Sequence, residues 1–243
     1  MTKRASPVAI AGFVIALGAA VALFIGGFGY NRGWWTLGDG FTIVKWGAYA
    51  GLAAVAVSLA GCFAATAPRR GLRLAAAGLV IGTLVFATAA TERDLGRGVP
   101  SIHDITTDTV DPPQFVAAVA ARAAAGARNP PEYDNVAAQQ RAAFPDIAPL
   151  VVNIPADQAF DQALAAARDM GWDILAAEES QGRIEATATT RWFRFRDDVV
   201  IRIRPEGAGA RIDVRSKSRI GLSDLGANAR RVRAYIALLR RSA

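Results

Sequence analysis

The sequence predicts three transmembrane helices followed by an α+β domain, in which helices cover one face of an antiparallel sheet. Three observations support this fold class. Long apolar runs fill most of residues 7–90, Lys and Arg residues flank them on alternating sides, and apolar and polar residues alternate in several segments after residue 150. Such runs are typical of membrane spans, and strict alternation is typical of half-buried strands.

The three apolar runs cover about 7–28, 41–65 and 72–90. At about 1.5 Å per residue, each forms a helix long enough to cross a hydrocarbon core. Lys3 and Arg4 would also suit the start of a cleavable signal peptide, but the first run is long for a signal core and leads into two further spans. We therefore expect a retained anchor, and cleavage would leave two spans and the same outer location.

The flanking charges predict the orientation of the spans. Lys3 and Arg4 precede the first run, and Arg69, Arg70 and Arg73 separate the second from the third. Basic residues concentrate in cytoplasmic loops, so both segments are expected inside, whereas the Trp-rich first loop faces out. We therefore expect a multi-pass protein of a bacterial inner membrane, with a cytoplasmic N-terminus and a periplasmic C-terminal domain.

Composition limits what this outer domain can be. It has about the size of one domain and contains no cysteine, since the one thiol, Cys62, lies in the second apolar run. The net charge of +7 comes mostly from the membrane region, but residues 92–182 hold 14 acids and 6 bases, and residues 183–243 hold 6 acids and 15 bases. Membrane lipid and an envelope protein are the expected partners, nucleic acid is not, and the oligomeric state stays open.

We divide the chain into residues 1–91, 92–149 and 150–243. The middle segment reads as a polar loop and an Ala-rich helical stretch that begins after Asp111-Pro112-Pro113 and ends at Gly126. The last segment has the pattern β-α-β-β-β-β-α. Its strands are expected at 150–154, 172–177, 183–190, 197–204 and 211–219, and its helices at 156–170 and 224–240. Both helices have apolar stripes, so the uncovered face of the sheet should be polar and rich in Arg.

Several separated motifs resemble one family. They are IHDITTDTVDPPQF at 102–115, Trp172, IEATATTRWFRFRDDVVIRI at 184–203 and RSKSRIGLSDLGANARR at 215–231. In this order and spacing they resemble the domain of unknown function 1499 family, over about residues 102–240. The resemblance implies an envelope or plastid-associated domain that in some members follows membrane spans. It implies no catalytic residue, and we assign none.

The polar face predicts an anion-binding site. Basic residues of two strands should be co-facial and open to solvent, and the N–H groups that begin the last helix add positive potential beside them. The proposed members are Arg202, Arg204, Arg215, Lys217, Arg219 and Asp224. In the alternative interpretation, Glu185, Asp197, Asp198 and Asp213 neutralise the arginines across the sheet, and Asp224 only caps the helix. The basic and aromatic run 191–196 either touches headgroups or is an ordinary hairpin connection.

An enzyme is the second hypothesis, a metal-assisted hydrolase that uses the loop of His103, Asp104 and Asp108 or the pair Asp197 and Asp198. Oxygen ligands in the loop would suit calcium, although turn and capping roles explain them as well. Consecutive strand residues point to opposite faces, and no nucleophile motif accompanies the single histidine. We therefore expect no catalytic residues, metal or cofactor, and favour a non-enzymatic binding module.

A transporter or channel is the third hypothesis. The spans carry no central charge, so the sequence shows no permeation path. Small residues such as Gly12, Gly18, Gly51 and Gly61 instead favour close packing of the helices, within the protein or with a partner.

Overall fold

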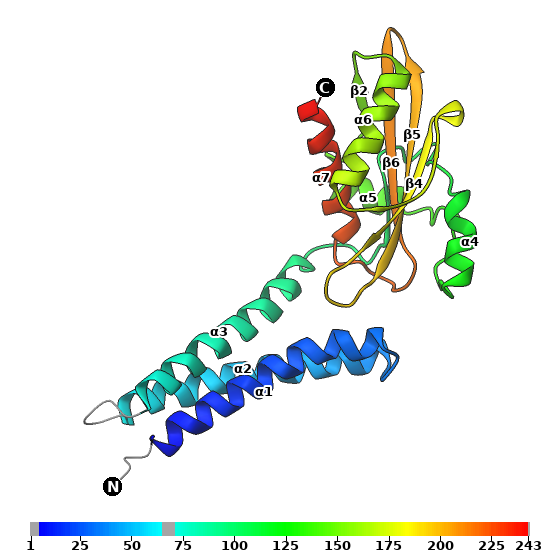
Figure 1. Cartoon of the computed structure of the whole chain (residues 1–243). Helices are drawn as coiled ribbons and strands as arrows, with labels where there is room; N and C mark the ends of the chain where they lie inside the picture. The colour runs from blue at the N-terminus through cyan, green and yellow to red at the C-terminus, as the bar shows by residue number, and fades with distance from the viewer. Residues whose placement is uncertain (1–4, 65–70, 243) are drawn as a thin grey trace. The chain divides into compact units, whose positions relative to one another are not determined.

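The computed structural model describes residues 5–64 and 71–242 (Figure 1). The chain forms two compact units. Unit 1 comprises residues 1–95 and 192–194, and unit 2 comprises residues 96–191 and 195–243. The predicted orienting cations Lys3, Arg4, Arg69 and Arg70 lie outside the described residues.

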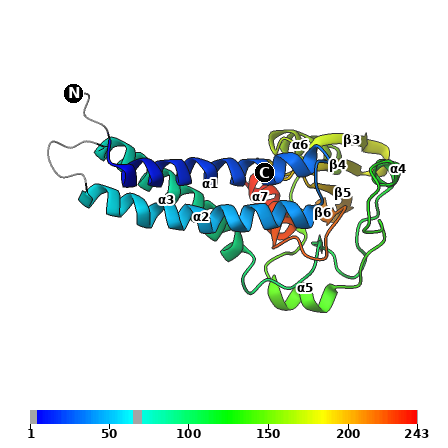
Figure 2. The ribbon, with the colours of Figure 1, turned by 90° about the horizontal axis from the view of Figure 1, so that it is seen from below.

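Unit 1 contains three helices, α1 (Pro7–Asn31), α2 (Leu37–Ala64) and α3 (Leu72–Leu95). All three lie side by side (Figure 2), and each is long and apolar enough to cross a membrane, which confirms three long apolar helices in this region. Each helix is longer than its predicted apolar segment at one end, because the polar residues there also adopt helical backbone. After α3, the left-handed Gly98 and then Pro100 prevent continuation, as expected.

The helices of unit 1 pack closely where glycines face Ser58, a fully buried residue of α2. A Cβ atom at Gly12 of α1 or at Gly78 of α3 would lie 2.5 Å from the Ser58 hydroxyl oxygen. Bare backbone is therefore required on both sides of this crossing. Gly51 and Gly61 are also at close approaches, but Gly18 has no atom within 4 Å of its Cβ position, so it does not serve packing within unit 1.

Unit 2 is built on a six-stranded antiparallel sheet. The strand order is β1-β6-β5-β4-β3, and β2 pairs with β6 as well. The strands are β1 (Asp104–Thr106), β2 (Leu150–Val152), β3 (Asp173–Glu178), β4 (Arg183–Thr189), β5 (Arg196–Glu206) and β6 (Gly209–Ser218). β5 and β6 turn at Gly207-Ala208, where Gly207 has φ +60°, and their register pairs Ile201 with Val214. β1 lies in a segment that was expected to be a loop, since three residues are too few for a periodic signal.

Two helices, α6 (Ala156–Asp169) and α7 (Ala227–Ser242), cover the apolar face of the sheet and confirm the predicted fold class. The core lies between these layers. Tyr235 is completely buried, stacks on Trp172 at 5.0 Å between ring centroids, and donates a 2.7 Å hydrogen bond to the carbonyl of Ala163. This bond satisfies the polar end of a buried aromatic residue and ties α7 to α6.

Three further elements complete unit 2: the helices α4 (Ala117–Ala124) and α5 (Ala137–Ala143), and the short 3-10 helix η1 (Glu179–Gln181). In Figure 1, α4 lies across the strands from α6 and α7. α4 contacts β3 and β4, and its residues face the polar side of the sheet. The second face is therefore not left open.

We predict opposite effects for two glycine-to-alanine variants of α1. Gly12→Ala forces a Cβ against the backbone of Ser58 and should destabilise unit 1 by about 1–3 kcal/mol. Gly18→Ala meets open space and should be neutral or raise helix stability by up to about 1 kcal/mol. Thermal unfolding of the full chain in detergent measures both, and equal midpoints for the two variants would contradict this packing.

Candidate functional site

The five predicted cations lie on one face of the sheet, opposite the hydrophobic core. β6 places Arg215 and Lys217 there, and Arg219 follows directly after that strand. The neighbouring β5 adds Arg202 and Arg204. Alternation along paired strands is sufficient to bring these side chains together.

Arg215 and Lys217 surround one carboxylate, that of Asp104 in β1. Arg215 donates to both of its oxygens, at 2.9 and 2.8 Å, and the Lys217 ammonium lies 3.3 Å away. Lys217 also pairs with Asp134 at 2.6 Å. Arg215, Lys217 and Asp104 are completely buried, and the carboxylates of Asp104 and Asp134 together balance the two positive charges.

Aromatic rings hold the Arg215 guanidinium in place. Its central carbon lies 4.8 Å from the ring centroid of Phe115 and 5.5 Å from that of Tyr133. Burial, helped by the charge of Asp104, raises the pKa of Tyr133 to about 12, so this phenol is neutral at physiological pH. The stacked rings add cation–π stabilisation to the ion pair.

A second buried carboxylate, Asp198 of β5, joins Arg219 to α4. Arg219 donates to both of its oxygens, at 2.9 and 2.7 Å, and Arg122 of α4 donates to it at 2.7 Å. The hydroxyl of Thr187 contributes a further bond at 2.8 Å. Burial lowers the pKa of Arg122, and the charge of Asp198 opposes this shift.

Glu185 of β4 fixes the beginning of α4. Its carboxylate accepts hydrogen bonds from the backbone N–H groups of Val116, Ala117 and Ala118, at 2.9–3.1 Å. α4 has no capping side chain of its own, so a carboxylate from the sheet satisfies its free N–H groups and complements its dipole. The Ala-rich helix is thereby held against the polar face.

The expectation that this basic face is open to solvent is wrong. Arg215 and Lys217 are 0% exposed and Arg219 is 6% exposed, beneath α4 and the segment around it. The physical reason is that acids at Asp104, Asp198 and neighbouring positions neutralise the cations, which lets the chain cover them. These contacts agree in part with the alternative interpretation. Asp198 and Asp213 neutralise arginines of this face as it proposed, but Asp197 pairs with Arg231 on the other face. Arg215 and Lys217 are neutralised by Asp104 instead.

Three arginines and three aspartates form a second, half-exposed cluster on the same face. Its members are Arg202, Arg204, Arg211, Asp108, Asp111 and Asp213. Arg202 contacts all three acids, at 3.2, 2.9 and 3.0 Å. Burial alone would raise the pKa of Asp108, but N–H bonds from Asp111 and Val110 and the charges of Arg211 and Arg202 hold it below its ordinary value. The charges balance, so the cluster carries no excess positive charge.

Asp224 lies in the loop that leads into α7 and serves as a cap. Its two oxygens accept hydrogen bonds from the N–H groups of Gly226 and Asn228, at 2.8 and 2.7 Å. Burial, the largest influence, raises its pKa despite these bonds. The carboxylate of Asp224 thus occupies the position that the predicted anion would take.

The residues of the enzyme hypothesis do not converge. His103 pairs with Asp134 at 2.9 Å, while Asp104 and Asp108 belong to the two separate clusters described above. Asp197 and Asp198 point to opposite faces, and Asp197 pairs with Arg231 at 2.6 Å. Within residues 5–64 and 71–242, no three His, Cys, Asp or Glu side chains are arranged to hold a metal ion.

Sequence reasoning missed the central role of Arg122 and the contributions of Tyr133 and Asp134. One signal was present for Arg122, which is the single charged residue of the otherwise apolar helix AAVAARAA. A lone cation on such a helix indicates a buried partner. Tyr133 and Asp134 lie in a Pro-rich loop whose position the sequence does not specify.

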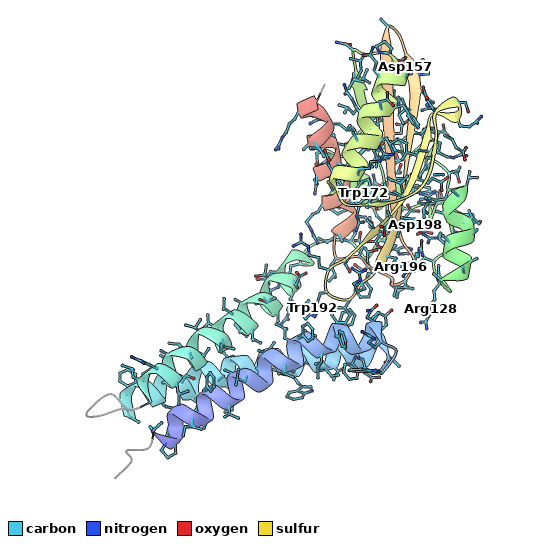
Figure 3. All side chains as sticks on the ribbon, viewed as in Figure 1. Arg128, Asp157, Trp172, Trp192, Arg196 and Asp198 are labelled. Atoms are coloured by element: carbon cyan, nitrogen blue, oxygen red, sulfur yellow. The ribbon has the colours of Figure 1, made fainter. Side chains whose placement is uncertain are left out.

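Exposed basic and apolar residues gather at one end of unit 2, and we call this group the tether-end surface. Its members are Arg128, Arg191, Arg196, Leu222, Leu225 and Arg230. Figure 3 labels Arg128 and Arg196 at this end, and both of their backbones hydrogen-bond to that of Arg219, at 2.9 and 3.1 Å. In the described part of the chain, none of the four arginines forms an ion pair. Leu222 is 83% exposed.

Asp198→Asn tests the buried network. It keeps the size of the side chain but removes the charge that Arg122 and Arg219 face, which should lower the free energy of unfolding of unit 2 by about 3–5 kcal/mol. The control Asp146→Asn breaks an exposed pair with Arg233 and should cost at most about 1 kcal/mol. Hydrogen exchange of the β5 and β6 amides in the full chain measures the difference, and equal protection in both variants would refute the network's role.

The lowered pKa of Asp108 predicts a specific dependence on acid. Ionised Asp108 stabilises the fold above its ordinary pKa near 3.8, and this stabilisation is lost as the pH falls through the lower folded-state pKa. Asp108→Asn should therefore be less stable than the wild type at neutral pH, with a smaller gap at about pH 3. Urea unfolding across this pH range tests it, and a gap that does not change with pH would contradict it.

The comparison with known proteins agrees with the motifs. A family model described as "Protein of unknown function (DUF1499)" matches residues 104–239, which run from β1 into α7 and include the buried network. No curated protein matches the chain. Because the model covers more than half of the sequence, the chain belongs to the DUF1499 family, as its motifs predicted.

Proposed function

We propose that this protein is a multi-pass protein of a bacterial inner membrane whose periplasmic unit 2 is a non-enzymatic module that binds anionic lipid headgroups. The binding site in this proposal is the tether-end surface, which replaces the predicted site on the sheet face. The observation that carries the proposal is a group of four exposed arginines without ion pairs in the described chain, beside two exposed leucines.

The contrast with the sheet face supports this assignment. There, cations such as Arg215 and Arg219 are satisfied by buried carboxylates and stabilise the fold. At the tether-end surface, Asp197 is buried and paired with Arg231, and Asp224 is engaged with backbone N–H groups. The positive charge of Arg128 and Arg196 is therefore available to an external anion.

Covalent connection supports a lipid as the source of that anion. Gly96 directly follows α3, and its Cβ position lies 2.8 Å from the Leu225 side chain. Leu225 thus packs against the residue that follows, in the chain, a helix apolar enough to cross a membrane. Basic residues close to a membrane attract anionic headgroups, and exposed leucines enter the region between headgroups and acyl chains.

Arginine suits this task because its planar guanidinium donates two parallel hydrogen bonds to a phosphate. Each basic residue near an anionic surface contributes about 1 kcal/mol, and salt weakens this contribution. The proposed module therefore binds through several weak contacts rather than through one deep pocket.

The orientation is tested separately from the ligand. Reporters fused at the C-terminus, one active only in the periplasm and one active only in the cytosol, should show activity of the periplasmic reporter alone, because the predicted cytoplasmic cations flank three spans. Activity of the cytosolic reporter would refute the periplasmic location.

Lipid binding is tested with two double variants that remove the same charge. Arg128→Gln/Arg196→Gln should reduce the affinity for phosphatidylglycerol by about 2 kcal/mol, roughly 30-fold, at low salt. Arg240→Gln/Arg241→Gln, at the far end of α7, should leave it unchanged. Native mass spectrometry of the full chain, titrated with phosphatidylglycerol or phosphatidylcholine, measures this. Equal losses in both variants, or no preference for the anionic lipid, would refute the site.

A further inference from the structure

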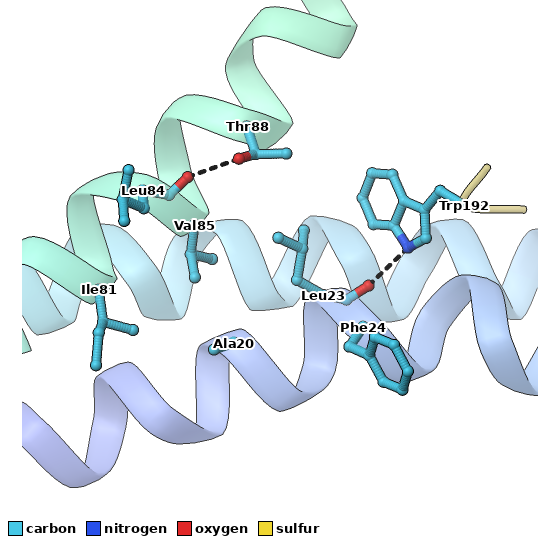
Figure 4. Close-up of a pocket in the computed structure, with 8 residues that line it drawn as sticks. All are labelled: Ala20, Leu23, Phe24, Ile81, Leu84, Val85, Thr88 and Trp192. Carbon is cyan, nitrogen blue, oxygen red and sulfur yellow. Dashed lines mark hydrogen bonds between the residues drawn. The ribbon is translucent and has the colours of Figure 1, made fainter.

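An apolar pocket of about 510 Å³ lies in unit 1, between α1 and α3 (Figure 4). Its volume falls within the range of about 300–1,000 Å³ that is common for small-molecule sites. The lining residues are Ala20, Leu23, Phe24, Ile81, Leu84, Val85, Thr88 and Trp192.

The polar groups of the pocket are already satisfied. The hydroxyl of Thr88 donates to the carbonyl of Leu84 at 2.8 Å, and the indole N–H of Trp192 donates to the carbonyl of Leu23 at 3.0 Å (Figure 4). Neither side chain has a donor left for a ligand. The pocket therefore favours an apolar occupant over a polar one.

The Trp192 ring packs closely on α1 because the residue beneath it, Gly27, has no side chain. A Cβ atom at Gly27 would lie 2.7 Å from the indole ring, so the ring rests directly on the helix backbone. Tryptophan is enriched where membrane lipid meets water, with its ring among the chains and its N–H group bonded. The indole thus forms one wall of the pocket.

We propose that this pocket binds one acyl chain of a membrane lipid. Apart from Trp192, its lining residues belong to helices that are long and apolar enough to cross a membrane, and Phe24 and Leu84 are 65% and 61% exposed. Acyl chains are the medium around such helices, and a pocket with only satisfied polar atoms matches their chemistry. The site depends on membrane insertion but not on the tether-end surface.

Photo-crosslinking of the full chain in nanodiscs tests this site. The probes are phospholipids with a diazirine in the acyl chain, one with a phosphatidylglycerol headgroup and one with phosphatidylcholine. Both should label peptides of residues 20–24 and 81–88 several-fold more than the lipid-facing residues around Val14 of α1 and Leu52 of α2. Ala20→Phe fills the pocket and should reduce this labelling several-fold, whereas Val21→Phe, on the exposed side of α1, should not.

Uniform labelling of all lipid-facing residues, or equal labelling of Ala20→Phe and Val21→Phe, would overturn the proposal. Quenching of fluorescence by brominated acyl chains gives a second measurement that needs no pocket-filling variant. The fluorescence of Trp192 is the difference between the fluorescence of the wild type and that of Trp192→Phe. Brominated acyl chains should quench this fluorescence strongly. If they do not, the proposed site is also overturned. If both probes label the pocket but the full chain binds phosphatidylglycerol no better than phosphatidylcholine, only the headgroup proposal for the tether-end surface is refuted.

Discussion

The structure of unit 2 depends on the neutralisation of buried cations by carboxylates of the same sheet. Asp198 accepts hydrogen bonds from Arg122 and Arg219, and Asp104 accepts two from Arg215. Away from water, each of these charges would be strongly unfavourable alone, so each pair is stable only when both members are present. This requirement explains why a sheet with one apolar face and one charged face is covered on both.

The same pairs connect distant parts of the chain into one unit. Arg122 and Asp198 are 76 residues apart, and Asp104 and Arg215 are 111 residues apart. Glu185 adds the attachment of the first turn of α4 through three backbone N–H groups. The cations thus organise the fold, and the exposed arginines of the tether-end surface are left as the candidates for contact with an external partner.

Much of the fold could be predicted because the spacing of apolar residues along a segment indicates which of its faces is buried. The three spans, the alternating strands β4 to β6 and the stripes of α6 and α7 follow directly from the sequence. The pattern also placed Arg215, Lys217 and Arg219 on one face, and Asp224 proved to be the helix cap of the alternative interpretation. What covers that face could not be predicted, because α4 and β1 are short and their partners lie far away in the sequence.

The most direct test of this account uses Lys217, one of only three lysines in the chain and the only one in unit 2. Its ammonium is completely buried between Asp104 and Asp134. Acylation of the native full chain with an amine-reactive ester, followed by mass spectrometry, should leave Lys217 unmodified until the protein is denatured. Modification of Lys217 in the native protein at the rate of an exposed lysine would contradict the buried network.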